Sequence, residues 1–354
     1  MPHNSALHVQ EGIPQPEPVS PYLQFKRKKR LSADAYIEGI LAGNRVVLSQ
    51  AITLIESTAH QDIETAGKII ERCLPYSGNS IRIGITGVPG VGKSTFIEAF
   101  GKYVTSIGKK LCVLAVDPSS EISKGSILGD KTRMEELSID PNAFIRPSPS
   151  GLTLGGVARK TRETIILCEA AGFDAIIIET VGVGQSETVV KSMVDFFLLL
   201  MLSGAGDELQ GIKRGIMEMA DALIITKADG DNIAKATAAK ALYKSALQLF
   251  PKNENEWRPP VDTCSVFLQD SIEKIWQIVS DFEKHTKANS FFLKHRTEQS
   301  VKTFYDWMND MLKEHFYSNK AIENKIDNLI SEIREGKISP YQAGTKLVQG
   351  YLAK

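Results

Sequence analysis

One short segment, at residues 87–95, constrains this chain more than any other part of it. Its sequence is GVPGVGKST, which fits the pattern G-x-x-x-x-G-K-[ST]. Glycines at these positions let backbone N–H groups surround the phosphates of a nucleotide. An apolar run at 81–85 precedes the segment and a helical pattern at 96–104 follows it, as that use requires. The segment therefore predicts a P-loop between a strand and a helix.

The chain after the P-loop alternates between short apolar runs and longer amphipathic segments. The apolar runs occupy residues 81–85, 111–116, 175–178, 196–202, 222–225 and 261–266. Amphipathic segments, such as 157–171 and 233–249, lie between them. Buried apolar strands that alternate with helices are typical of a parallel sheet covered on both faces. We therefore predict an α/β P-loop NTPase with a mostly parallel sheet covered by helices.

Further segments flank this α/β region, which we place at residues 80–285. Residues 1–31 are polar and rich in proline and end in a basic run at 26–30, so they predict a disordered arm. Residues 32–79 show helical spacing and predict an N-terminal helical region. Two apolar stripes predict a C-terminal helical region at 286–354, which packs on the sheet domain or forms a dimer face.

Charge and cysteine content exclude several classes of protein. Lys plus Arg and Asp plus Glu both count 42, so nothing indicates a nucleic-acid or membrane-surface binder. The four cysteines are scattered without a C-x-x-C pair, which fits a reducing compartment. No signal peptide opens the chain, and no apolar run is long enough to span a bilayer. We expect a cytoplasmic protein.

The P-loop pattern predicts a role for individual residues of the phosphate site. Lys93 is expected to reach the β- and γ-phosphates, and the Ser94 hydroxyl is expected to bind Mg²⁺. The other nucleotide-binding residues predicted here are Gly87, Gly90, Val91, Gly92 and Thr95.

Three acidic residues are candidate magnesium ligands together with Ser94. Asp117 follows the run at 111–116, Asp130 lies in the next loop, and Glu179 ends the run at 175–178. From such positions, carboxylates of P-loop proteins hold Mg²⁺ and orient water. Gly182, in the loop after Glu179, can donate its N–H to the γ-phosphate and so sense hydrolysis. The predicted catalytic residues are Lys93, Glu179 and Gly182.

The tetrapeptide Thr226-Lys227-Ala228-Asp229 resembles the guanine-reading N-K-x-D motif of GTPases. The Asp229 carboxylate would accept hydrogen bonds from guanine N1–H and the exocyclic amine, a donor pair that adenine lacks. Thr226 replaces the usual Asn and so removes an amide that ties this loop to the P-loop. Ser265 lies where GTPases place a backbone contact to guanine O6. We expect GTP and GDP, and not ATP, as the ligands.

Three further blocks are more specific than the P-loop. They are GSILGDKTRM at 125–134, ETVGVGQSE at 179–187 and GDELQGIK at 206–213. With the P-loop, they resemble the MeaB/ArgK family of methylmalonyl-CoA mutase-associated GTPases over residues 35–354. Besides Thr226, Ser123-Lys124-Gly125 departs from the Thr-Gly-Gly that relatives often have.

The resemblance implies a Mg²⁺-dependent, homodimeric GTPase that hydrolyses GTP to GDP and phosphate. Its partner would be an adenosylcobalamin-dependent acyl-CoA mutase, for which it acts as a chaperone that gates cofactor loading and protects the mutase. The resemblance also implies that residues 206–213 form an additional switch loop and that 286–354 form the dimerisation region. The chain has no evident cobalamin-binding signature, so the cobalamin is expected on the partner.

Two alternatives remain at this point. A metal-insertion GTPase should offer Cys or His ligands near the nucleotide, yet all six histidines fall outside 81–284. A P-loop small-molecule kinase would need an acceptor pocket and a base, for which the sequence has no clear candidate. No arginine finger is assigned, because Arg133, Arg159 and Arg162 are each explained more simply as helix-surface residues. We therefore expect slow intrinsic turnover that the mutase accelerates.

Overall fold

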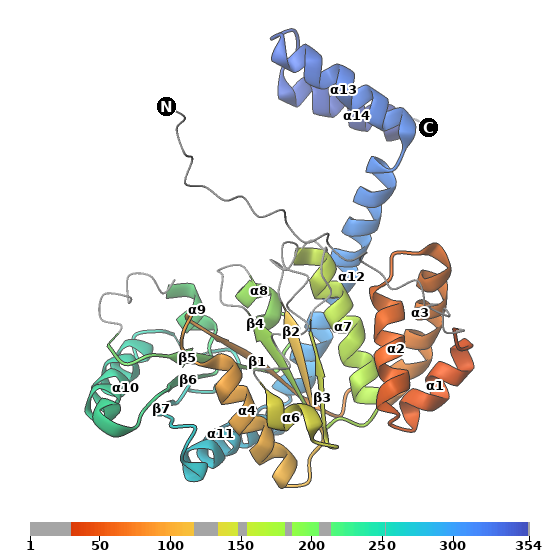
Figure 1. Cartoon of the computed structure of the whole chain (residues 1–354). Coiled ribbons are helices and arrows are strands. Elements are labelled where there is room, and N and C mark those ends of the chain that lie inside the picture. The colour runs from red at the N-terminus through yellow and green to blue at the C-terminus, as the bar shows by residue number, and fades with distance from the viewer. Residues whose placement is uncertain are drawn as a thin grey trace, which may run out of the picture. The chain divides into compact units, whose positions relative to one another are not determined.

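The computed structural model describes residues 30–116, 134–147, 154–180, 186–204, 214–251 and 253–352 (Figure 1). The chain divides into two units, Met1–Ser32 and Ala33–Lys354, and the architecture below is that of the second. Residues 1–29 of the predicted arm lie outside the described part of the chain. Within that part, no helix combines the length and apolar character needed to cross a membrane.

Seven parallel strands form one sheet, in the order β3-β2-β4-β1-β5-β6-β7. The strands are β1 Ile81–Gly87, β2 Leu111–Val116, β3 Ala143–Arg146, β4 Ala175–Thr180, β5 Phe196–Met201, β6 Ala222–Ile225 and β7 Val261–Thr263. This confirms the predicted α/β fold. The sequence did not predict β3, because its apolar run is only three residues long, Ala143 to Ile145, and Arg146 and Pro147 follow at once.

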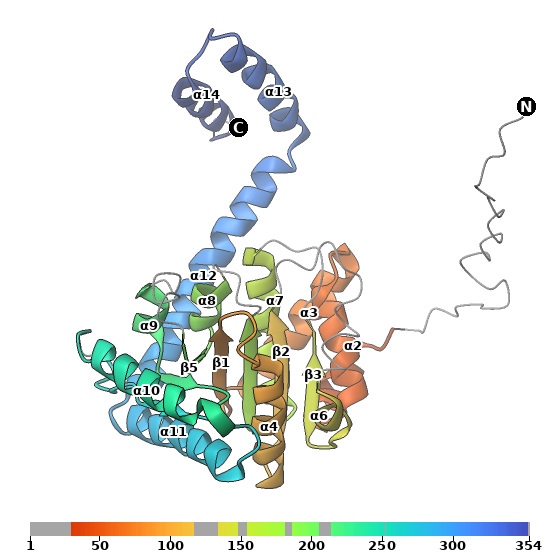
Figure 2. The same ribbon diagram turned by 60° about the vertical axis from the view of Figure 1, so that its left-hand side comes forward.

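Helices cover both faces of the sheet because side chains alternate along each strand. On β5, Phe196, Leu198 and Leu200 pack with the helices of one face. Those helices are α4 Lys93–Ser106, α6 Glu135–Ile139 and α11 Gln269–Ala288, of which α4 and α11 lie side by side (Figure 2). The other face is covered by α7 Leu154–Ala170, α8 Ser186–Lys191, α9 Arg214–Met219 and α10 Ile233–Leu247.

Three N-terminal helices pack against α7, and α2 also reaches the edge of the sheet, where Glu56 pairs with Arg146 of β3. They are α1 Ala33–Leu41, α2 Arg45–Glu56 and α3 His60–Cys73, and the 3-10 turn η1 Leu74–Tyr76 follows them. The Asn44 side chain caps α2 by accepting the N–H groups of Val46 and Val47 at 3.0 and 3.2 Å.

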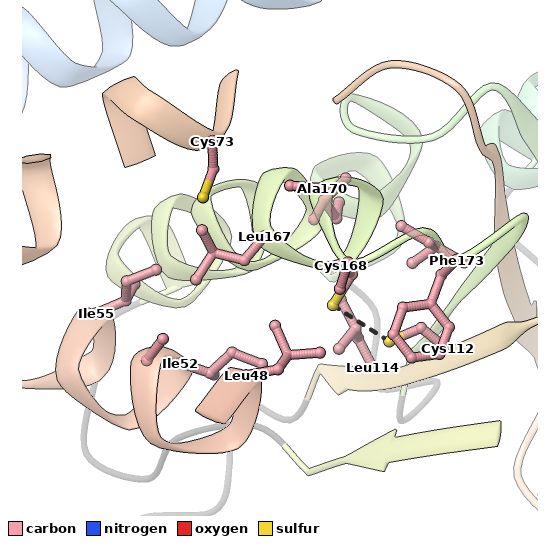
Figure 3. Close-up of a cluster of buried hydrophobic side chains, with 14 of the residues drawn as sticks. Leu48, Ile52, Ile55, Cys73, Cys112, Leu114, Leu167, Cys168, Ala170 and Phe173 are labelled. Carbon is pink, nitrogen blue, oxygen red and sulfur yellow. Dashed lines mark hydrogen bonds between the residues drawn. The ribbon is translucent and has the colours of Figure 1, made fainter. Parts of the chain in front are cut away.

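The core between α2, α7 and β2 contains a pair of cysteines (Figure 3). The Cys112 thiol, on β2, donates to Sγ of Cys168, on α7, over 3.5 Å. Both side chains are fully buried, and burial raises the pKa of the Cys112 thiol well above its usual range. This pair therefore packs as neutral thiols in an apolar layer.

The C-terminal region consists of α12 Phe291–Tyr317, α13 Lys320–Arg334 and α14 Pro340–Leu352. Helix α12 contacts α11 and α13, and α13 packs against α14. Much of the apolar stripe on the second half of α12 is exposed, including Phe304, Met308 and Met311.

An ionic cluster anchors the first half of α12 beneath the amino ends of the strands. Arg296 donates to both carboxylate oxygens of Asp195, at 2.8 and 2.6 Å, and to the carbonyls of Gly78 and Ser80. Nearby, Arg82 donates two hydrogen bonds of 2.9 Å to Glu169, which ends α7. Because almost every polar atom here has a partner, the cluster fixes α12 relative to the sheet.

Candidate functional site

The P-loop connects the end of β1 to the start of α4. Gly87 is required by a close approach, since a Cβ there would lie 2.6 Å from the carbonyl oxygen of Leu200 on β5. Gly90 and Gly92 have φ values of 80° and 89°, in the left-handed region that favours glycine. A Cβ at Gly90 would meet no atom within 4 Å. The loop therefore has a backbone that favours glycine at two positions and leads into the N-terminus of α4, which is suited to phosphates.

Lys93, the first residue of α4, lies at this loop. Its ammonium group donates to the carbonyl of Gly87 at 2.9 Å. Burial lowers the pKa of Lys93, whereas the negative charges of Glu179 and Glu187 raise it in part. A half-buried cation of this kind gains a strong partner when phosphate oxygens enter the loop. Glu187, on α8, is buried and was not predicted as a site residue, although it ends one of the distinctive sequence blocks.

The register of the sheet places Glu179 at the centre of the site. Glu179 lies between Ile85 of β1, which leads into the P-loop, and Ala115 of β2, which leads to Asp117. It is buried, and the strand continues one residue beyond it. That next residue, Thr180, donates its hydroxyl to the Thr86 hydroxyl at 2.8 Å and so joins the ends of β4 and β1.

The residues in this region fit a magnesium ion. Ser94 and Glu179 supply a hydroxyl and a carboxylate, the hard oxygen ligands that Mg²⁺ prefers, beside a loop shaped for phosphates. Asp117, Asp130 and Gly182, the other predicted residues of the magnesium and switch segments, lie outside the described residues.

The guanine loop is bonded directly to the P-loop. The Thr226 hydroxyl donates to the carbonyl of Val91 at 2.8 Å, and Nζ of Lys227 donates to the carbonyl of Gly90 at 2.9 Å. The departure at Thr226 therefore leaves the two loops connected, because the Thr226 hydroxyl bonds the P-loop where an Asn amide is usual. Lys227 has a φ of 56°, and this uncommon backbone conformation turns its stem towards the P-loop.

Asp229 and Ser265 come together after β6 and β7. The Ser265 hydroxyl donates to Oδ2 of Asp229 at 2.8 Å, which orients the carboxylate. The N–H of Ser265, expected near guanine O6, donates to the Ser271 hydroxyl at 3.1 Å. Ser265 thus acts on the loop through its side chain, a role that its position in the sequence did not indicate.

Two of the three arginines considered above lie on α7. The Arg159 guanidinium is 3.4 Å from the ring centroid of Trp307 on α12. Arg162 donates to the Ser192 hydroxyl at 2.7 Å. Arg133 lies outside the described residues.

Comparison with known proteins gives the same assignment as the site. The family model described as Methylmalonyl Co-A mutase-associated GTPase MeaB matches residues 48–321. A Putative GTPase of Caulobacter vibrioides is 46% identical over 321 residues, which span 91% of this chain and 98% of the relative. GTPase ArgK of Escherichia coli is 44% identical, over 86% of this chain and 92% of its own length.

A mitochondrial protein of Mus musculus, Methylmalonic aciduria type A homolog, is 43% identical over 92% of this chain and 81% of its own length. Among solved structures, one described as LAO/AO transport system kinase matches with a TM-score of 0.73 and 36% identity. It covers 90% of this chain and 97% of its own. Because the family model matches most of the chain and relatives match it almost end to end, the chain belongs to the MeaB family of methylmalonyl-CoA mutase-associated GTPases.

Proposed function

We propose that this chain is a magnesium-dependent GTPase that hydrolyses GTP to GDP and phosphate. The observation that supports this best is the direct bonding of the guanine loop to the P-loop through Thr226 and Lys227. This connection supports one site in which Asp229 would read the base and Lys93 would hold the phosphates. Adenine would leave Asp229 desolvated without a donor pair, so GTP is favoured over ATP.

Hydrolysis would proceed by positioning and charge neutralisation. Lys93 would leave the Gly87 carbonyl for the β- and γ-phosphates, and backbone N–H groups of the loop would hold the same oxygens. Bound Mg²⁺, held by Ser94 with Glu179, Asp117 and Asp130, would offset the negative charge of the phosphates. Gly182 would donate its N–H to the γ-phosphate, and a water molecule would attack in line.

The proposed partner is an adenosylcobalamin-dependent acyl-CoA mutase of the methylmalonyl-CoA type. The chain would act as its chaperone in the cytoplasm, gating cofactor loading and protecting the mutase. This proposal is supported by the family and by a relative whose name refers to methylmalonic aciduria. Residues 80–285 would hydrolyse GTP, and 286–354 would form a homodimer through the exposed apolar stripe of α12.

The experiment is GTP hydrolysis by the purified chain, with and without such a mutase, with ATP as the control nucleotide. We expect slow GTP turnover that rises when the mutase is added. Turnover that no such mutase changes would contradict the partner and leave the GTPase intact. ATP turnover at an equal rate would contradict the assignment of Asp229.

A further inference from the structure

A hollow of about 400 Å³ is lined by the first half of α7, by α8 and the residue after it, and by the middle of α12, which runs past α7 (Figure 1). Most of the residues that line it are polar or charged, with charges of both signs, and one is aromatic. The residues that line it are Gly155, Ala158, Arg159, Arg162, Thr188, Val189, Ser192, Lys302, Thr303, Asp306, Trp307, Asn309, Asp310 and Lys313. None of them belongs to the nucleotide site described above.

The charges of this hollow are unbalanced in favour of cations. Four of the lining side chains are basic and two are acidic. Among the described residues, Lys302 and Lys313 have no ion-pair partner and are exposed. Arg159 is paired with Glu163 at 3.1 Å, so three cations remain against two carboxylates, and this excess favours an acidic ligand.

Arg162, at one wall, is an incompletely compensated cation. Its nearest described carboxylate is that of Asp306, 3.7 Å away, and Asp306 is itself half exposed. Its buried Nε has no hydrogen-bond partner among the described residues. Burial lowers the pKa of the Arg162 guanidinium, and Asp306 offsets this only in part. A buried charge with so weak a partner is costly unless another anion approaches it.

The shape of the hollow favours a protein segment over a single small anion. Its lining on α12 runs from Lys302 to Lys313, which is three helical turns or about 16 Å. Over that length, Asp306 and Asp310 interrupt the basic residues. A phosphate held at one end would leave the other cations without a partner, whereas an extended chain can present carboxylates at several points.

We propose that this hollow is the docking site for an acidic segment of the protein partner, which places carboxylates against Lys302, Lys313 and Arg162. The inference rests on the proposed function for the existence of that partner. Arg162 also holds Ser192 at the end of α8. A carboxylate that draws Arg162 towards the hollow would therefore act on the helix that contains Glu187, a neighbour of Lys93.

The test measures binding of the full-length chain to an adenosylcobalamin-dependent mutase by calorimetry, in the presence of a non-hydrolysable GTP analogue. The double variant Lys302→Glu/Lys313→Glu should weaken binding on the order of tenfold or more, and raised salt should weaken the wild type more than the variant. Lys274→Glu/Lys284→Glu, the same total charge change at two exposed sites on α11, should bind like the wild type. Basal GTP hydrolysis should be unchanged in both.

The variant Asp310→Asn changes the charge of the hollow in the opposite direction to the double variant. It removes one negative charge from the lining and should strengthen binding, whereas loss of structure would weaken it. If the wild type binds and Lys302→Glu/Lys313→Glu binds as well as Lys274→Glu/Lys284→Glu, the docking site is refuted. Displacement of the mutase from the wild-type chain by millimolar inorganic phosphate would also refute the docking site, and would indicate a site for small anions instead. If the wild type binds no such mutase, the proposed partner fails, and the docking site proposed for it fails with it.

Discussion

At the scale of single residues, the site depends on hydroxyl groups that reach across loops. Thr226 connects the guanine loop to the P-loop, and Ser265 orients Asp229. Both side chains are buried, so each bond is protected from water. Two predictions separate base recognition from loop positioning.

Replacing Asp229 with Asn should weaken GTP binding about a hundredfold, because an amide donor would face the guanine N1–H. Xanthosine triphosphate, which presents a carbonyl where guanine has its amine, should bind the variant better than GTP does. Nucleotide affinities measured by calorimetry would show this reversal. Asp231→Asn, at an exposed neighbour, should leave the affinities unchanged. Unaltered GTP affinity of Asp229→Asn would remove Asp229 from the site.

Replacing Thr226 with Val keeps the shape of the side chain but removes its hydrogen bond to Val91. The carbonyl would lose a buried partner, so GDP affinity should fall about fivefold. Thr237→Val removes a comparable hydrogen bond from a hydroxyl to a carbonyl at an exposed position on α10, and serves as the control. Equal GDP affinities for the two variants would show that the tie does not position the site.

At the scale of elements, the ionic cluster at the amino ends of the strands joins segments that are distant in sequence. Arg296 belongs to α12, Asp195 precedes β5, Arg82 lies on β1 and Glu169 ends α7. The Glu169 carboxylate also accepts the Ser80 hydroxyl at 2.7 Å and the Gly78 N–H at 2.8 Å. The cluster and the nucleotide site occupy opposite ends of the same strands, so stability and chemistry can be altered separately.

Replacing Arg296 with Met should lower the free energy of unfolding by about 3 kcal/mol, because buried Asp195 would lose its main partner. Lys294 lies on the same helix, but its ion pair with Glu298 is exposed. The substitution Lys294→Met should therefore change stability little. Urea denaturation of both variants measures the difference. A loss no greater for Arg296→Met than for Lys294→Met would contradict the anchoring role.

The same cluster predicts a dependence of stability on pH. Burial raises the pKa of Glu169, but hydrogen bonds and charge from Arg82 outweigh this, so its pKa lies below the ordinary 4.5. The stability that Glu169 contributes is fully present above that value and is lost as the pH falls through the lower pKa of the folded chain. Denaturation between about pH 3 and pH 6 should therefore show a weaker pH dependence for Glu169→Gln than for the wild type.

At the scale of the whole molecule, helix α12 has two different faces, an exposed apolar stripe and a charged face that lines the hollow. Phe304, Met308 and Met311 recur at helical spacing and are exposed, whereas Lys302 and Asp306 line the hollow. An exposed apolar stripe of this kind is costly in water unless a partner covers it. The proposed homodimer would cover the stripe and leave the hollow to the other partner.

Replacing Met311 with Asp should convert the dimer to a monomer of 38.9 kDa, because a charge would be buried at the centre of the stripe. Light scattering after size-exclusion chromatography measures the mass. Leu242→Asp, at a half-exposed position on α10, should remain dimeric. A wild-type chain that is itself a monomer would refute the proposed dimer.

The local sequence was sufficient for the P-loop, the predicted strands and the residues of the guanine loop. Glycine conformation, continuous apolar runs and carboxylate chemistry are properties of a few neighbouring residues, so they are visible without a structure. Only the tertiary structure decided that the Thr226 hydroxyl reaches Val91, that Glu187 acts on Lys93, and that α7 and α12 enclose a basic hollow. These contacts join residues that are far apart along the chain. Their distances depend on how strands and helices pack, which no local pattern specifies.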